Sequence, residues 1–95
     1  MISFTVRMKF APEDQSVIRE ILRNLGSASR QEPGCVSYVT HYVESDPNTV
    51  VIYEQYQDVD ALEAHRSSQH FDQYATNGLY RKVRERSVET LVEVK

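Results

Sequence analysis

The apolar residues change their period in the middle of the chain, and this change constrains the fold more than any other feature of the sequence. Residues 50–56 alternate from one strand face to the other, which is typical of a β-strand. Beyond Asp58 the apolar residues recur at helical spacing, beginning with Ala61 and Leu62. Asp58 can cap this helix through its carboxylate. The sequence therefore predicts a strand that leads directly into a helix.

The first third of the chain predicts another strand followed by a helix. Residues 2–10 alternate cleanly, with apolar residues at the even positions, and predict a half-buried strand. Pro12 suits the first position of a helix. Apolar residues then follow at helical spacing until Pro33-Gly34, which ends the helix.

The remaining segments complete the order of elements. A strand over residues 35–44 and a strand over residues 49–57 flank a turn at residues 45–48, which predicts a hairpin. Ser67 or Ser68 can cap a further helix that carries apolar residues as far as position 83. A last strand is predicted over residues 87–94.

The order strand, helix, strand, strand, helix pair, strand is that of the split βαβ, or ferredoxin-like, arrangement. We therefore expect an α+β fold in which helices cover one face of a four-stranded antiparallel sheet, in a single domain over residues 1–95. The other face of the sheet remains partly apolar, so we expect another protein surface to bury it. Because a short chain forms a modest core, we expect a homodimer that forms through the sheet faces.

The composition excludes several classes of function. The chain has 11 basic and 14 acidic residues and lacks the basic stripe that nucleic-acid binding usually needs. Its first ten residues, MISFTVRMKF, alternate in polarity and lack the apolar segment of a signal peptide. No apolar run approaches membrane-spanning length. We expect a cytoplasmic protein that binds neither nucleic acid nor a membrane.

Five side chains that can exchange protons or donate hydrogen bonds lie on or near the change of period: Glu54, Tyr56, His65, His70 and Tyr74. His65 follows Leu62 by three residues, on the helix side expected to face the sheet, where an imidazole can act as a general base. The alternative is a packing histidine bonded to a backbone group. Glu54 either orients His65 or accepts a hydrogen bond from a substrate, and the alternative is a structural ion pair.

The aromatic candidates have two interpretations as well. Tyr56 and Tyr74 can hydrogen-bond a substrate oxygen while their rings pack against it, or they can be amphipathic core residues. His70 is either a catalytic residue or a packing residue near a helix start. The apolar wall of a pocket would come from Phe4, Val6, Ile52, Leu62 and Phe71.

No cofactor and no metal ion are expected. The chain has no glycine-rich phosphate loop, and therefore no nucleotide or flavin fingerprint. His65 and His70 are five residues apart, which places them on different faces of a continuous helix. His41 lies on a separate strand, and Cys35 is the only cysteine.

Four segments carry a resemblance to a known family: Glu32–Cys35, Glu54–Asp58, Ala61–His65 and Ser68–Phe71. In this order they resemble the antibiotic biosynthesis monooxygenase (ABM) family of small dimeric α+β barrels. The resemblance covers nearly the whole chain. It implies the ferredoxin-like fold and the homodimer.

The resemblance also implies a range of activities. The family includes cofactor-free oxygenases of quinols and aromatic polyketides, haem-degrading proteins, and proteins that process a sugar-like autoinducer. The chain is thus expected to be a cofactor-independent monooxygenase of a quinol, phenol or similar electron-rich molecule, with His65 as base, Glu54 orienting it, and Tyr56 and Tyr74 holding oxygens. Two alternatives are a non-catalytic ligand-binding or interaction dimer and a keto-sugar phosphate isomerase, although no phosphate site is apparent.

Two departures from the family pattern narrow this range. The chain has no tryptophan, whereas members often carry one at the position of Tyr56. The haem-degrading relatives use an asparagine, a tryptophan and a histidine at the positions that align with Val6, His65 and Ala75. Because none of the three is present, the sequence argues against haem cleavage.

Overall fold

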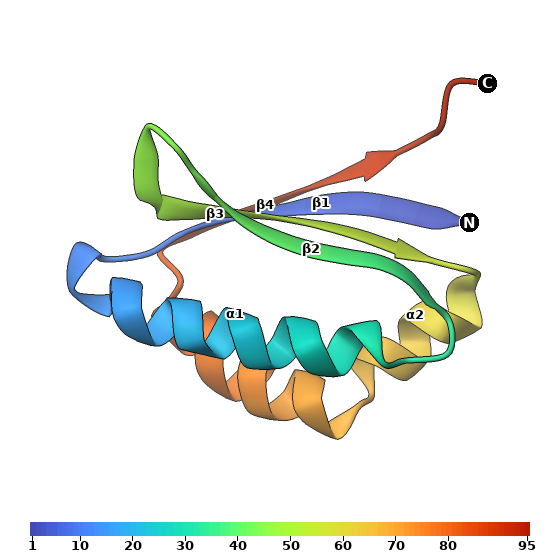
Figure 1. Ribbon diagram of the computed structural model, residues 1–95, viewed down its shortest axis with the longest axis horizontal. Helices are drawn as coiled ribbons and strands as arrows, with labels where there is room; N and C mark the ends of the chain where they lie inside the picture. Colours follow the sequence, from blue (N-terminus) through green and yellow to red (C-terminus); the bar gives the residue numbers. More distant parts are fainter.

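The computed structural model describes residues 1–95 and has a four-stranded antiparallel sheet with all helices on one face (Figure 1). The strands are β1 (Ile2–Lys9), β2 (Cys35–Val43), β3 (Asp46–Tyr56) and β4 (Glu85–Leu91), in the spatial order β2-β3-β1-β4. The helical elements are η1 (Pro12–Asp14), α1 (Gln15–Arg30), α2 (Val59–Arg66), η2 (Phe71–Leu79) and α3 (Tyr80–Lys82). The predicted ferredoxin-like α+β fold is confirmed.

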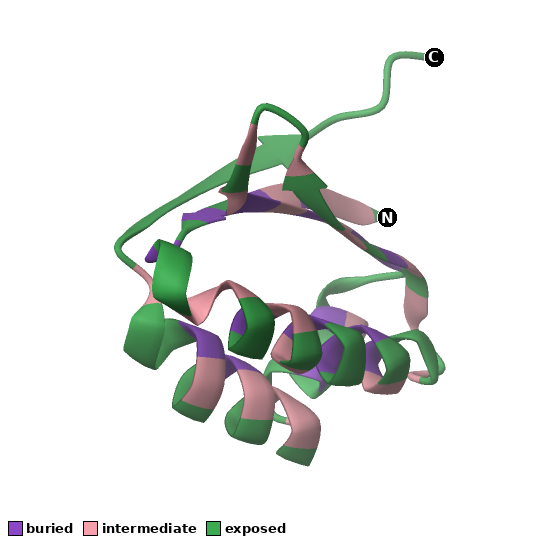
Figure 2. Cartoon of the chain, turned by 60° about the vertical axis from the view of Figure 1, so that its left-hand side comes forward, coloured by how far each residue is buried: buried purple, intermediate pink, exposed green.

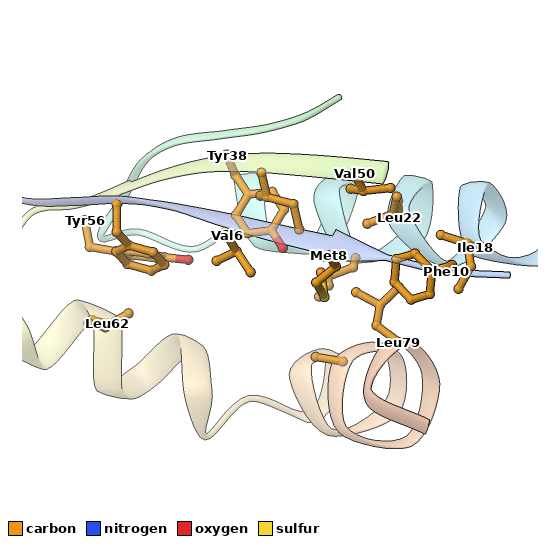
Figure 3. Close-up of a cluster of buried hydrophobic side chains, with 14 residues drawn as sticks. Val6, Met8, Phe10, Ile18, Leu22, Tyr38, Val50, Tyr56, Leu62 and Leu79 are labelled. Atoms are coloured by element: carbon orange, nitrogen blue, oxygen red, sulfur yellow. The ribbon is translucent and has the colours of Figure 1, made fainter. Parts of the chain in front are cut away.

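The core lies between the sheet and the helices, where buried residues of both layers face one another (Figure 2). The even positions of β1 point into it, as the alternation predicted, and α1 contributes one apolar stripe. In Figure 3, Tyr56 and Leu62 lie at one end of the core, and Phe10 and Ile18 lie at the other. No helix combines the length and the apolar composition needed to cross a membrane.

The hairpin between β2 and β3 is tighter than predicted. The expected turn at residues 45–48 is wrong, because the turn occupies Glu44 and Ser45, and β3 already begins at Asp46. Pro47 is accommodated in β3 because the pairing with β2 is irregular there. The last strand also differs from the predicted range: it begins at Glu85 and ends at Leu91.

Two side-chain caps define the helices beneath the end of β3. The Ala61 N–H donates to Asp58 Oδ1 at 2.8 Å, which confirms the predicted cap of α2. The Phe71 N–H donates to Ser68 Oγ at 3.1 Å, and the same hydroxyl donates to the His65 carbonyl at 2.7 Å. The predicted break between the two helices is therefore present, and Ser68 stabilises both sides of it.

The turn that follows α1 packs directly against α2. A Cβ atom added to Gly34 would lie 2.3 Å from the Cβ of Ala61, so only glycine fits this approach. The Gln57 N–H also donates to the Gly34 carbonyl at 3.0 Å. These contacts hold the segment that carries Glu32 between the end of β3 and α2.

Substitution of Gly34 by alanine is expected to lower the free energy of unfolding by about 1–3 kcal/mol, because the new methyl group overlaps Ala61. Ala61→Gly alone should cost about 1 kcal/mol through lost helix propensity. The double variant should lose less free energy of unfolding than the two single variants lose together, because removal of the Ala61 methyl group makes room for the new one. Urea denaturation of all four proteins measures this coupling, and strict additivity would contradict the proposed overlap.

Candidate active site

The structure brings four of the five predicted proton-handling residues together and adds a fifth member. We call Glu32, Glu54, Tyr56, His65 and His70 the polar cluster. Glu54 and Tyr56 come from β3, His65 from α2, His70 from the segment after the helix break, and Glu32 from the turn after α1. Four separate segments of the chain therefore converge on one place between the sheet and the helices.

The strand part of the polar cluster is a buried tyrosine–carboxyl pair. Glu54 and Tyr56 are two residues apart on β3, so both side chains point to the core face. The Tyr56 hydroxyl donates to Glu54 Oε1 at 2.6 Å. Glu54 is 5% exposed and Tyr56 is completely buried. A carboxyl group at this depth needs a partner, and the tyrosine supplies it.

His65 is fixed by a carboxylate on one side and by aromatic rings around it. Its Nδ1 lies 2.8 Å from Glu32 Oε2, whereas its Nε2 lies 3.7 Å from Glu54 Oε1. The rings of Tyr56 and Phe71 lie at centroid distances of 5.1 and 5.2 Å. Glu32, rather than the predicted Glu54, is thus within hydrogen-bond distance of the imidazole and orients it.

Glu32 joins the two histidines of the polar cluster. Its Oε2 atom contacts both His65 Nδ1 and His70 Nε2. Because a carboxylate oxygen accepts hydrogen bonds, both of these ring nitrogens carry protons. In neutral His65 the remaining nitrogen, Nε2, therefore holds a lone pair directed toward Glu54. This tautomer leaves one basic nitrogen on the sheet side of the imidazole.

Burial changes the proton affinity of the buried groups. Desolvation raises the pKa of Glu54 to about 7, although the Tyr56 hydrogen bond opposes the change. Desolvation also lowers the pKa of His65, against the opposing effect of Glu32. The pKa of Tyr56 is raised by desolvation and by Glu54. Glu54 is therefore able to hold or release a proton near neutrality, while His65 remains available as a neutral base.

The remaining predicted site residues lie around the polar cluster. Phe4, Val6, Ile52 and Leu62 belong to the buried core, and Phe71 and Tyr74 pack against it. Tyr74 makes no hydrogen bond to the polar cluster. Whether these side chains contact a substrate remains a prediction.

Two surface cavities lie apart from the polar cluster. One, of about 390 Å³, lies between α1 and the hairpin of β2 and β3. The other, of about 310 Å³, lies over β1, β4 and the start of β3. Neither is lined by a residue of the polar cluster. The most exposed members of the cluster are the side chains of His70, at 22%, and Glu32, at 14%.

Glu32 is the functional candidate that the sequence analysis missed. Its partners lie 33 and 38 residues further along the chain, so no local spacing pointed to them. One signal was available: Glu32 lies just beyond the C-terminus of a helix, where the helix dipole disfavours an acidic residue. An acidic residue at such a position indicates a partner elsewhere in the fold.

The fold and the polar cluster together define a small ferredoxin-like α+β domain with a buried acid–base centre between its sheet and its helices. A family model described as "Antibiotic biosynthesis monooxygenase" matches residues 1–77. The chain belongs to this ABM family.

Individual relatives agree with this assignment. The chain is 32% identical over 73 residues to "Putative monooxygenase Rv0793" of Mycobacterium tuberculosis, a match that covers 77% of this chain and 71% of the relative. The crystal structure of PA3566 from Pseudomonas aeruginosa is 26% identical, with a TM-score of 0.90 over 99% of this chain and 94% of that one. A crystal structure of an antibiotic biosynthesis monooxygenase superposes over the full length of both chains with a TM-score of 0.92, and at 24% identity it supports the fold alone.

Removal of the Tyr56 hydroxyl is expected to destabilise the protein. Tyr56→Phe leaves Glu54 without its donor in the core, which should lower the free energy of unfolding by about 1–3 kcal/mol. Tyr42→Phe is the matched control, because Tyr42 is 55% exposed and its hydroxyl makes no hydrogen bond, and it should change the free energy of unfolding by less than about 0.5 kcal/mol. Chemical denaturation measures both, and equal effects would contradict the structural importance of the pair.

Proposed function

We propose that the protein is a cofactor-independent monooxygenase that acts on a quinol, a phenol or a similar electron-rich small molecule in the cytoplasm. The observation that carries this proposal is the polar cluster, in which a buried imidazole keeps a free nitrogen beside a carboxyl group of raised pKa. Membership of the ABM family supports the same class of reaction.

In this proposal His65 is the general base, and its Nε2 removes a proton from the substrate hydroxyl. Glu32 holds the imidazole by its Nδ1 proton and stabilises the imidazolium that forms. When Glu54 is protonated, its carboxyl group can donate a hydrogen bond to the developing oxyanion, and the Tyr56 hydroxyl holds that carboxyl group in place. A substrate ring can reach Nε2 only if side chains around His65 move, because His65 is 2% exposed.

The substrate itself supplies the electrons in this reaction. Deprotonation makes the ring electron-rich enough to react with dioxygen. For a quinol, one oxygen atom enters a ring C–H bond and the other leaves as water, while the quinol is oxidised to the quinone. The overall reaction is quinol plus O₂ giving hydroxyquinone plus water, so no external reductant is needed.

A second candidate is a non-catalytic ligand-binding or interaction protein of the same fold. The observation that favours it is the close packing around His65, which is 2% exposed. The two cavities described above also lie away from the polar cluster. In this case Glu32 and Glu54 are structural partners of a buried histidine. The two candidates differ in whether the protein consumes oxygen.

Oxygen uptake with a panel of quinols, measured with an electrode and corrected for spontaneous oxidation, tests the first candidate. His65→Ala is expected to lower kcat/KM by roughly 10²–10⁴-fold, because it removes the base. His41→Ala is the matched control, since His41 is exposed on β2 and lies outside the polar cluster. Full activity in His65→Ala would refute the assignment of the base. If no quinol gives uptake above background with the wild type, the non-catalytic candidate is favoured.

We also propose that the protein is a homodimer that forms through the open face of the sheet. The helices cover only one face of the sheet (Figure 1). Every residue of β4 is exposed. Thr5, Tyr53 and Val39 lie side by side in register on the open face, and Val39 is 44% exposed. A second copy would remove these side chains from water.

Sedimentation at micromolar concentration is expected to give twice the mass of the 11.0-kDa chain. Val39→Glu should raise the dissociation constant of the dimer by more than about tenfold, because it buries an unpaired charge at the interface. Val17→Glu is the matched control, since Val17 has a similar exposure of 42% but lies on α1. A monomeric wild type, or equal effects of the two variants, would overturn the proposed interface.

A further inference from the structure

We propose that Glu32, His65 and His70 bind a divalent first-row transition-metal ion. The proposal reverses the expectation drawn from the spacing of the two histidines. That expectation assumed a continuous helix, whereas the chain breaks at Ser67 and Ser68 and turns His70 back toward the same carboxylate as His65. The site lies on the side of His65 opposite to Glu54.

The three donor atoms already converge. Glu32 Oε2, one ring nitrogen of His65 and one ring nitrogen of His70 all lie within 4.8 Å of one another. An ion bound at about 2.0–2.2 Å from each donor holds its ligands roughly 3–3.5 Å apart. The side chains therefore need only small rotations to admit an ion, without a change in the fold.

A second, independent observation is the free oxygen of Glu32. Its Oε1 atom is buried and has no hydrogen-bond partner. A buried acceptor without a partner is costly and requires an explanation. A cation between the histidines would satisfy it, since the carboxylate can turn so that either or both oxygens face the ion.

Glu54 fits the role of a supporting residue for this site. A histidine that binds a metal through one nitrogen usually donates its other N–H to a carboxylate, which fixes the ring. With an ion at Nδ1 of His65, the proton moves to Nε2, which faces Glu54 Oε1 at 3.7 Å. The carboxylate–histidine–metal arrangement needs only a modest shortening of this distance.

The donor set selects the class of ion. Two imidazoles and one carboxylate suit Zn²⁺, Fe²⁺ and Co²⁺, and three protein ligands leave at least one position open for water or a small molecule. The His70 side chain is 22% exposed, which gives an ion a route from solvent. Hard ions such as Mg²⁺ and Ca²⁺ prefer oxygen ligands and should bind poorly.

Metal binding has a defined consequence for the proposed reaction. The ion takes Nδ1 and leaves the proton on Nε2, so His65 no longer has a free lone pair. A bound ion should therefore inhibit the cofactor-independent reaction. The metal site itself does not depend on that reaction, because binding is measured on the protein alone.

The test is titration of the untagged, metal-free protein with Co²⁺, followed by visible absorption, and with Zn²⁺, followed by calorimetry. The wild type is expected to bind one ion per chain with a saturable change in absorption. His70→Gln and Glu32→Gln should each weaken binding by at least about tenfold, because each removes a ligand. His41→Gln is the matched control and should leave the affinity unchanged. Circular dichroism and thermal melting show whether each variant is folded.

Two results would overturn the proposal. One is a wild type that shows no saturable binding up to millimolar Co²⁺ or Zn²⁺. The other is an affinity that falls in His41→Gln as much as in His70→Gln, which would place the ion on surface histidines. If a ligand variant proves unfolded, the wild type is instead treated with diethyl pyrocarbonate with and without Zn²⁺. The ion is expected to protect His70 from modification. Equal modification of His70 in both cases would contradict the site.

Discussion

The contact between Glu32 and His65 is the interaction on which the arrangement of the site depends. It joins the turn after α1 to α2 across 33 residues of sequence, and the same oxygen also reaches His70 beyond the helix break. A buried imidazole and a partly buried carboxylate are each costly alone, and the pair offsets that cost. The orientation of the imidazole, its tautomer and the position of its free nitrogen all follow from this contact.

Several local features make that contact available. Gly34 allows the turn to approach Ala61 more closely than any side chain would permit. The caps at Asp58 and Ser68 fix where α2 begins and where the next helix starts. The geometry of the polar cluster is therefore held by backbone and cap interactions outside it, which is how a rigid acid–base centre is positioned in a chain of 95 residues.

The same cluster supports two different uses of His65. With a proton on Nδ1, the imidazole presents a basic Nε2 to the sheet side, which suits removal of a proton from a phenol or quinol. With a metal ion on Nδ1, the proton lies on Nε2 and the base is lost. A proton and a metal ion cannot both occupy Nδ1 of His65. Nε2 can therefore act as a base only when Nδ1 carries the proton and no ion is bound. Membership of the ABM family defines the fold. In the proposed reaction, the choice of substrate would depend on the side chains around this cluster.

Four short segments of the sequence indicated the family through their resemblance to it. The spacing of residues determined the order of the elements, the buried faces of β1 and α1, and the cap at Asp58. Each of these follows from spacing over a few residues, because strand and helix geometry repeat locally. It also placed Glu54, Tyr56 and His65 near one another, since a strand and the helix after it stay adjacent. Only the tertiary structure decided that Glu32 orients His65 and that His70 joins them. Those contacts depend on how α1 and α2 pack against the same sheet. The spacing of residues within one helix does not predict how far that helix lies from another.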